Sequence, residues 1–479
     1  MQLKQEHFPI LSLYITFLFF ILLSIFSSDI PFFWDGITFS NVTDFYFKTN
    51  FSSFILPTDL DTTGSPLLHW MYVALMWKLF GKTLIVSHLA LLPFLLGIAW
   101  EYYKLAKRFL PPNIIPYTML LLLMEPTFIT QCVLMGYDVP MLYFFLLALN
   151  SLLSGNGLTY IIAILLLGLS NARGILMDFS LLLFHLLLFA NSLKGSFLKQ
   201  IKLYIPAVII IGGWTFYHYY QTGWFFINSA SSTISDREIV PVSMMIRQCV
   251  YLFWYLFDFG RVFIWLFIFV GLYFLRYKPL IKSEILNLVA IVICTLLVCI
   301  IFFSPLSNPI SHRYLLMVFL PSQILFCFII HNLHLKKSVF IVVGLMIPIM
   351  LLTGNFWLYG GGFSNGWDTS LKGLFYFKPR NQMIEYVKHE KINPHEIGAK
   401  FPLYHDLRYS DLVKESFCFT NMEELPIEEF RFVLLSNVSN LFTVREKEKL
   451  KKDWILLSEY RNGEIFIQLF KNPVELRID

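Results

Sequence analysis

Residues 284–303 read EILNLVAIVICTLLVCIIFF, and Glu284 is the only charged side chain in this run. About 20 helical residues cross a hydrocarbon core of ~30 Å with every backbone group hydrogen-bonded internally. The run therefore predicts a membrane-spanning helix. Similar apolar runs recur over the first 354 residues and predict about eleven spans: 9–27, 83–103, 113–133, 138–153, 157–172, 174–192, 203–220, 248–273, 284–303, 314–333 and 338–354.

The charged residues divide the chain into a membrane part and a soluble part. Of 479 residues, 57% are hydrophobic and 14% charged, against about 25% charged in soluble proteins. The last 100 residues hold 15 Lys/Arg and 17 Asp/Glu, whereas only 37 charged residues occur before them. We expect an α-helical polytopic membrane protein with a small C-terminal α/β domain. The predicted parts are a transmembrane domain over 1–354 with an extracytoplasmic loop at 28–82, a linker over 355–379 and a soluble domain over 380–479.

Local patterns predict elements outside the spans. In the soluble part, 380–390 and 444–454 have helical spacing, while 430–436 and 464–470 are typical of strands. In the first loop, 65–80 reads SPLLHWMYVALMWKLF, which is too short and too interrupted by charge to span. We expect it to form a helix that lies at the membrane interface, anchored by its two tryptophans.

Loop charges predict the orientation, because short loops rich in Lys and Arg stay in the cytoplasm. With Lys4, alternate loops hold 12 basic residues: Lys104, Lys107, Arg108, Lys194, Lys199, Lys202, Arg276, Lys278, Lys282, Lys336 and Lys337 complete the set. The opposite loops hold seven: Lys48, Lys78, Lys82, Arg173, Arg237, Arg247 and Arg313. We therefore expect a multi-pass protein of the bacterial inner membrane with a cytoplasmic N-terminus, an uncleaved first span and an extracytoplasmic C-terminal domain.

Several functional classes lose support. The basic residues form no stripe with interleaved aromatics, which argues against nucleic-acid binding. The six cysteines lie mostly in apolar runs without a CxxC pair, as expected for buried small hydrophobes. No Walker loop, GxSxG, HExxH or Rossmann fingerprint occurs, which disfavours ATP-driven and metal-protease chemistry.

Two carboxylates at the predicted outer face are candidates for catalysis. Asp35 lies in PFFWDG, among aromatic residues that would lower the local dielectric and favour its use as a base. A solvated Asp-Gly turn is the alternative. Asp138 lies in GYDVP at the start of the fourth span, where it would otherwise cap a helix or complement its dipole.

Other acidic residues and one histidine have weaker assignments. Asp59 and Asp61 could hold a divalent cation or cap the interfacial helix, and Asp61 could also contact an acceptor. His69 in that helix is a possible acceptor or metal contact, although packing is the simpler interpretation. Glu125, inside the third span before a proline, needs a partner within the bundle. These residues are too few to support a metal site, and we predict no cofactor.

Arginines at the same face suit phosphate, because the planar guanidinium matches phosphate geometry. Arg313, with His312 beside it, opens the tenth span, and Arg173 and Arg247 also face outward. Each could instead be an interfacial anchor. Asp258 and Arg261, three residues apart in the eighth span, are expected to pair with each other.

The ordered set of these motifs resembles the GT-C superfamily of membrane glycosyltransferases. The resemblance is to family 39, including protein mannosyltransferases and aminoarabinose transferases. It rests on FFWDG after the first span, TGSPLLHWMYVALMWKLFG, GYDVPMLYFFLLAL and SHRYLLMVFLP, followed by a C-terminal domain. It covers most of the chain. One departure is Ser65-Pro66-Leu67, where many relatives have His-Pro-Pro, and this weakens a role for a histidine there.

The resemblance implies an inverting transfer from a polyprenyl-phosphate sugar to an extracytoplasmic lipid, glycan or protein acceptor. Asp35 would be the general base, and Asp138 would orient the acceptor or the surroundings of Asp35. Arg313, with Arg247, Arg173 and His312, would bind the donor phosphate. Competing classes are a transporter or flippase for a lipid-linked sugar, an O-antigen ligase-like protein and a non-catalytic assembly protein.

Overall fold

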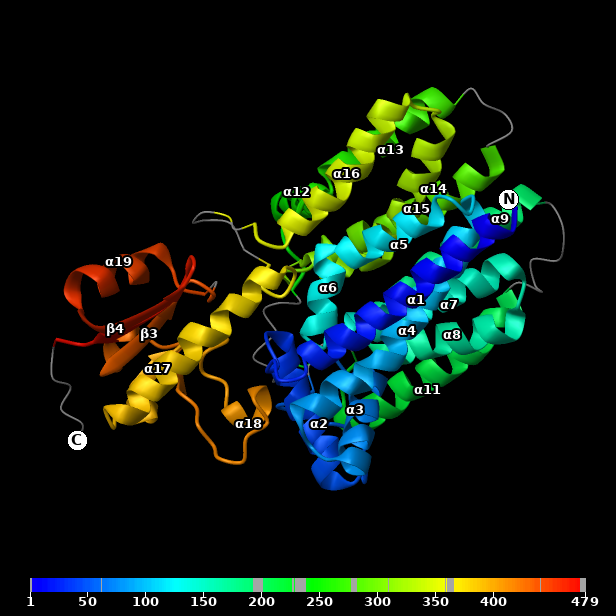
Figure 1. The fold of residues 1–479 in the computed structure, drawn as a ribbon. Helices are drawn as coiled ribbons and strands as arrows, with labels where there is room; N and C mark the ends of the chain where they lie inside the picture. The colour runs from blue at the N-terminus through cyan, green and yellow to red at the C-terminus, as the bar shows by residue number, and fades with distance from the viewer. Residues whose placement is uncertain are drawn as a thin grey trace. The chain divides into compact units, whose positions relative to one another are not determined.

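The computed structural model describes residues 2–61, 63–192, 201–225, 228, 238–276, 282–308, 310–357, 359, 366–439 and 441–473. Four loop charges used for the orientation, Lys194, Lys199, Arg237 and Lys278, lie outside these residues. The chain divides into two compact units (Figure 1). The first contains Met1–Asp29 and Val42–Asn355, and the second contains Ile30–Asn41 and Phe356–Asp479. Part of the first loop thus folds with the C-terminal residues, a grouping that the predicted boundaries did not include.

The first unit is helical, as the apolar runs predict. Its elements are α1 (Gln2–Phe26), α3 (Leu68–Phe80), α4 (Leu84–Phe109), α5 (Ile115–Met124), α6 (Pro126–Val133), α7 (Asp138–Ser154), α8 (Gly157–Ser170), α9 (Ala172–Ser192), η1 (Lys202–Tyr204), α11 (Ile205–Thr222), α12 (Val242–Phe257), α13 (Val262–Leu275), α14 (Lys282–Phe303), η4 (His312–Leu315), α15 (Leu316–Asn332) and α16 (Lys337–Gly354). Helix α2 (Asp35–Thr49), which we did not predict, begins in the second unit and continues in the first. Every predicted span coincides with one helix or a pair, and α3 coincides with the predicted interfacial helix.

Length and composition support part of the predicted span count. Among the described residues, five helices are long and apolar enough to cross a membrane: 8–26, 84–109, 285–303, 312–332 and 337–354. The α12–α13 pair makes a sixth if it is one span. The count of eleven remains a prediction, since several other apolar helices are shorter than a full crossing.

The eighth predicted span, 248–273, is not one straight helix. Helices α12 and α13 meet at an angle of 92°. Asp258 caps the end of α12, and Phe259 and Gly260 follow with φ of 51° and 83°. Gly260 also passes so close to α16 that a Cβ there would lie 2.2 Å from the Met350 carbonyl oxygen. The turn therefore depends on a residue without a side chain.

Neighbouring helices in the first unit pack pairwise. Helix α7 packs between α4 and α8, α8 packs on α9, and α9 packs on α14. Helix α15 contacts both α13 and α14, and 94% of its apolar window is buried. Figure 1 shows α1 beside α4 and α5, which it contacts. The starts of α7 and α9 and the turn before α15 thus belong to one connected set of helices.

The second unit contains a five-stranded sheet in the order β2-β1-β3-β5-β4. The strands are β1 (Ile397–Ala399), β2 (Thr420–Asn421), β3 (Phe432–Ser436), β4 (Ile455–Asn462) and β5 (Ile465–Lys471). Strand β1 is parallel to β2 and β3, whereas β5 is antiparallel to β3 and β4. The helices are η5 (Leu371–Tyr376), α17 (Phe377–His389), η6 (Pro394–Glu396), α18 (Leu407–Ser410), η7 (Ile427–Glu429) and α19 (Val444–Asp453). The small C-terminal α/β arrangement is confirmed, and η5 lies in the stretch predicted as linker.

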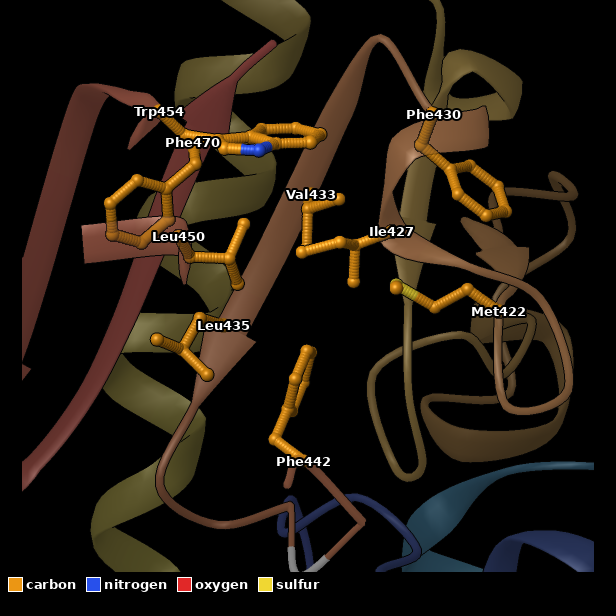
Figure 2. Packing of buried hydrophobic residues seen from close by; sticks show 9 residues of the cluster. All are labelled: Met422, Ile427, Phe430, Val433, Leu435, Phe442, Leu450, Trp454 and Phe470. Carbon is orange, nitrogen blue, oxygen red and sulfur yellow. The ribbon is translucent and has the colours of Figure 1, made fainter. Parts of the chain in front are cut away.

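A cluster of buried hydrophobic side chains covers one face of this sheet (Figure 2). Val433 and Leu435 point from β3 toward Leu450 and Trp454, which come from α19 and its end. Because successive strand residues face opposite sides, the equally buried Leu434 serves the other face. The sheet is therefore buried on both faces at β3, which explains the continuous apolar run FVLLS.

Candidate functional site

Two arginines converge on one carboxylate in the first unit. Asp138 is the first residue of α7, Arg173 lies in the first turn of α9, and Arg313 lies in η4. Arg173 Nη1 is 2.7 Å from Asp138 Oδ1, and its Nη2 donates to Oδ2 at 3.3 Å. Arg313 Nε is 3.7 Å from Asp138 Oδ2. The side chains of Asp138, Arg173 and Arg313 are only 1%, 12% and 6% exposed. We call these three residues the arginine cluster.

Tyrosine rings hold both guanidinium groups of the arginine cluster. The Arg173 guanidinium carbon lies 4.1 Å from the centre of the Tyr314 ring and 4.7 Å from that of Tyr137. For Arg313 the corresponding distances are 5.7 and 5.4 Å. Trp70 of α3 contacts Tyr137 in turn, with 6.4 Å between ring centres. These cation–π contacts fix the planes of both guanidinium groups.

His312 contacts a different carboxylate. Its Nε2 is 2.7 Å from Asp258 Oδ2, and its ring stacks against Tyr255 and Phe259 at 3.9 and 4.5 Å. These contacts tie η4 to the end of α12. His312 therefore supports the backbone that carries Arg313.

The partner of Glu125 is Arg261. Arg261 Nε donates to Glu125 Oε1 at 2.8 Å, a second guanidinium nitrogen reaches the same oxygen, and Nη2 also donates to Thr127 at 2.6 Å. Glu125 is fully buried and also accepts from the Phe128 N–H. The expected pairing of the Asp258 and Arg261 side chains is wrong, because Arg261 Nη1 reaches only the backbone carbonyl of Asp258, at 3.2 Å. The 92° bend redirects each side chain to another segment.

Asp61 and His69 contact different partners. Asp61 Oδ2 lies 2.8 Å from His218 Nε2 of α11, and its Oδ1 accepts from the Gly64 N–H, so Asp61 closes the loop before α3. His69 is buried against Trp70 and Phe94. Burial lowers the pKa of His69 to about 3, and its Nδ1 has no hydrogen-bond partner. Within the described part of the chain, no three His, Cys, Asp or Glu side chains are grouped for a metal.

The remaining predicted residues lie elsewhere. Arg247 is exposed on α12 and takes part in none of the ion pairs among the described residues. Asp35 is the first residue of α2, so its Asp-Gly pair begins a helix and is not a loop turn. Its segment belongs to the second unit. Sequence reasoning missed the Asp61–His218 and Glu125–Arg261 pairs, because no local pattern links residues so far apart.

Comparisons with known proteins agree with this architecture. No family model matches the chain, and a search of curated proteins finds no match. Among solved structures, ArnT from Cupriavidus metallidurans bound to undecaprenyl phosphate is similar, with a TM-score of 0.57, 12% identity and coverage of 95% of this chain and 97% of that chain. ArnT from the same organism in the apo state gives 0.55, 12%, 94% and 96%. At this identity the likeness shows a shared fold, and it confirms the predicted helical membrane architecture with a small C-terminal domain.

Proposed function

We propose, on the premise that the chain has a GT-C fold, that it is a membrane glycosyltransferase using a polyprenyl-phosphate sugar. The observation that carries the proposal is the arginine cluster, in which two guanidiniums meet at one buried carboxylate. Guanidinium groups bind phosphate oxygens through paired, charge-assisted hydrogen bonds. The similar ArnT structure is bound to undecaprenyl phosphate, which is a polyprenyl phosphate.

Arg173 and Arg313 would bind the donor phosphate. Polyprenyl phosphate is a good leaving group, so stabilising its charge contributes more than protonating it. Asp138 would be a positioning residue, because it contacts both guanidiniums. His312 would position Arg313 through η4, and the exposed Arg247 takes no part in this proposal.

Asp35 would be the general base. The acceptor hydroxyl oxygen bonds to the anomeric carbon, its proton moves to the Asp35 carboxylate, and the bond between the anomeric carbon and the phosphate oxygen breaks. The electron pair stays on the phosphate, and the configuration of the anomeric carbon inverts. A half-buried carboxylate beside Trp34 is accessible to an acceptor and partly shielded from water.

The loop charges favour an extracytoplasmic location for this chemistry. The predicted orientation puts the N-terminus inside and the first loop, Arg173 and Arg313 outside. The acceptor would be an extracytoplasmic lipid, glycan or protein.

The test is release of polyprenyl phosphate by the full-length protein in lipid nanodiscs. A panel of polyprenyl-phosphate sugars serves as donor, and a crude membrane extract supplies acceptors. We expect release by the wild type, loss with Asp35→Asn, and a raised donor KM with Arg313→Ala. Arg247→Ala is the matched control, since it removes an arginine outside the cluster. Full activity of Asp35→Asn would refute the assignment of the base.

The same assay separates a transporter of lipid-linked sugars from a transferase. A transporter would bind the donor without releasing polyprenyl phosphate. Binding without release for every donor in the panel would therefore contradict the proposed reaction.

A further inference from the structure

The segment that carries Asp35 is fastened to the C-terminal residues on both sides of the carboxylate. The Phe32 N–H donates to the Ser410 carbonyl at 2.8 Å. The Ser40 hydroxyl donates to the Tyr409 carbonyl, and Ser40 is fully buried. Both acceptors lie on α18. Residues 30–41 therefore take their position from a part of the chain more than 360 residues away.

Aromatic packing adds to these two hydrogen bonds. Phe33 contacts Tyr376 and Phe377 with 5.4 and 5.6 Å between ring centres. Trp34 meets Phe401 edge to face at 4.7 Å. Trp34 also has a φ of 53°, a left-handed conformation that a tryptophan keeps only where its surroundings impose it. The backbone at Asp35 is thus set by tertiary contacts rather than by local preference.

The acceptor carbonyls are held in place by a partly buried ion pair. Arg380 of α17 donates to both carboxylate oxygens of Asp411, at 3.0 Å from Nη1 and 2.6 Å from Nη2. The Ser410 hydroxyl donates to Asp411 Oδ2 at 2.6 Å. A bidentate arginine–carboxylate pair fixes direction as well as distance. This pair therefore orients the end of α18, whose carbonyls hold Phe32 and Ser40.

Little space is left for the segment to shift. The cavity lined by Phe32, Ile37 and Arg380, among others, measures about 10 Å³. That volume accommodates about one water molecule. Phe32, Phe33 and Ile37 are all buried.

We propose that the C-terminal residues of the second unit position the catalytic base: α17 and α18, through the Arg380–Asp411 pair, hold residues 30–41 so that Asp35 keeps its place. The inference rests on the proposed function of Asp35. It assigns the C-terminal residues a role in the chemical step instead of a role in recruiting a partner. Arg380 and Asp411 are positioning residues, since they act through α18.

The kinetic consequence is a selective loss of turnover. A base displaced by about 1 Å lowers the rate of proton transfer by as much as about 100-fold. Donor phosphate binding is assigned to other residues, so the donor KM is unaffected. A variant that only destabilised the fold would instead reduce the amount of active enzyme and speed exchange throughout the second unit, without selectivity for residues 30–41.

Asp411→Asn is the test variant, and Glu446→Gln is its matched control. Asp411 (20% exposed) pairs with Arg380 (6%) at 2.6 Å, and Glu446 (21% exposed) pairs with Lys400 (5%) at 2.7 Å. Both substitutions remove one carboxylate charge from a pair in the same unit. Glutamine also preserves the helix cap that Glu446 forms.

The full-length protein in nanodiscs is measured in two ways: amide hydrogen exchange over residues 30–41, and steady-state release of polyprenyl phosphate. We expect Asp411→Asn to speed exchange at Phe32 about tenfold or more and to lower kcat by about 10- to 100-fold, with the donor KM within about twofold. Glu446→Gln should change neither quantity. Ser40→Ala, which removes one hydrogen bond and leaves the ion pair, should show a smaller loss of kcat in the same direction.

Unchanged exchange at 30–41 in Asp411→Asn would overturn the inference, and so would faster exchange with wild-type kcat. A wild type that is inactive on every donor would instead refute the proposed function. The two failures are therefore distinguishable.

Discussion

Replacing Glu125 with glutamine leaves the Arg261 guanidinium buried without its carboxylate partner. Arg261 makes two contacts with one Glu125 oxygen, and both residues are almost fully buried. Removing one member of a buried ion pair costs about 3–5 kcal/mol. Glutamine retains one acceptor oxygen, so we expect the lower end, about 3 kcal/mol. That shifts the folded-to-unfolded ratio on the order of a hundredfold.

Arg261→Met should cost less than Glu125→Gln. The carboxyl group left behind can take up a proton and become neutral, whereas a guanidinium stays charged. The double variant Glu125→Gln/Arg261→Met leaves neither charge, so its loss should be well below the sum of the two single losses. The difference between that sum and the loss in the double variant measures the coupling between the α5–α6 break and the α12–α13 bend.

Glu101→Gln is the control for this prediction. Glu101 is a buried carboxylate of α4, but its partner Lys104 is 44% exposed and can return to water. The expected cost is about 1 kcal/mol or less. The assay is denaturant unfolding in detergent micelles, followed by tryptophan fluorescence. A loss of stability for Glu125→Gln no larger than that for Glu101→Gln would contradict this prediction, and so would two single losses that simply add in the double variant.

Three further outcomes are expected. Leu450→Ala, which opens a hole in the core of the second unit (Figure 2), should cost about 2–5 kcal/mol in the unfolding of that unit, measured by denaturant titration. Burial raises the pKa of Glu446, but hydrogen bonds from Lys400 and Thr443 outweigh it and hold this pKa below 4.5. Stability from Glu446 is therefore present above about pH 4.5 and lost as the pH falls through the lowered folded-state pKa, and Glu446→Gln should flatten that part of the pH–stability curve. Arg313→Lys keeps the charge but loses the planar fork, so the donor KM should rise about tenfold, and an unchanged KM would remove Arg313 from the phosphate site.

Local composition predicted most of the helices and two of the strands. Runs such as 284–303 can satisfy their backbone in a membrane only as helices, and each predicted span coincides with a helix or a helix pair. The strands at 432–436 and 465–471 and the helix at 444–453 also follow from spacing. Strand β4, ILLSEYRN, was missed because its apolar residues are confined to its first three positions and do not alternate with polar ones.

The arginine cluster was only partly accessible from the sequence. The expectation that Asp138, Arg173 and Arg313 lie at one face followed from their places at span ends, but their contact depends on how α7, α9 and η4 pack. Arg247 has the same local signature and lies apart, exposed on α12. Residue type and position at a span end therefore predict more arginines for the phosphate site than the packing brings together.

Hydrophobicity and periodicity are local properties of the chain, so the helical membrane class, most elements and the acidic and basic candidates could be predicted from them. The partners of these residues depend on tertiary packing: Glu125 pairs with Arg261, Asp258 with His312, and Phe32 and Ser40 with the carbonyls of α18. These contacts join residues between 54 and 378 positions apart. Buried charges and carbonyls are stabilised by the partners that packing brings within hydrogen-bond distance. Which groups come that close depends on the whole fold.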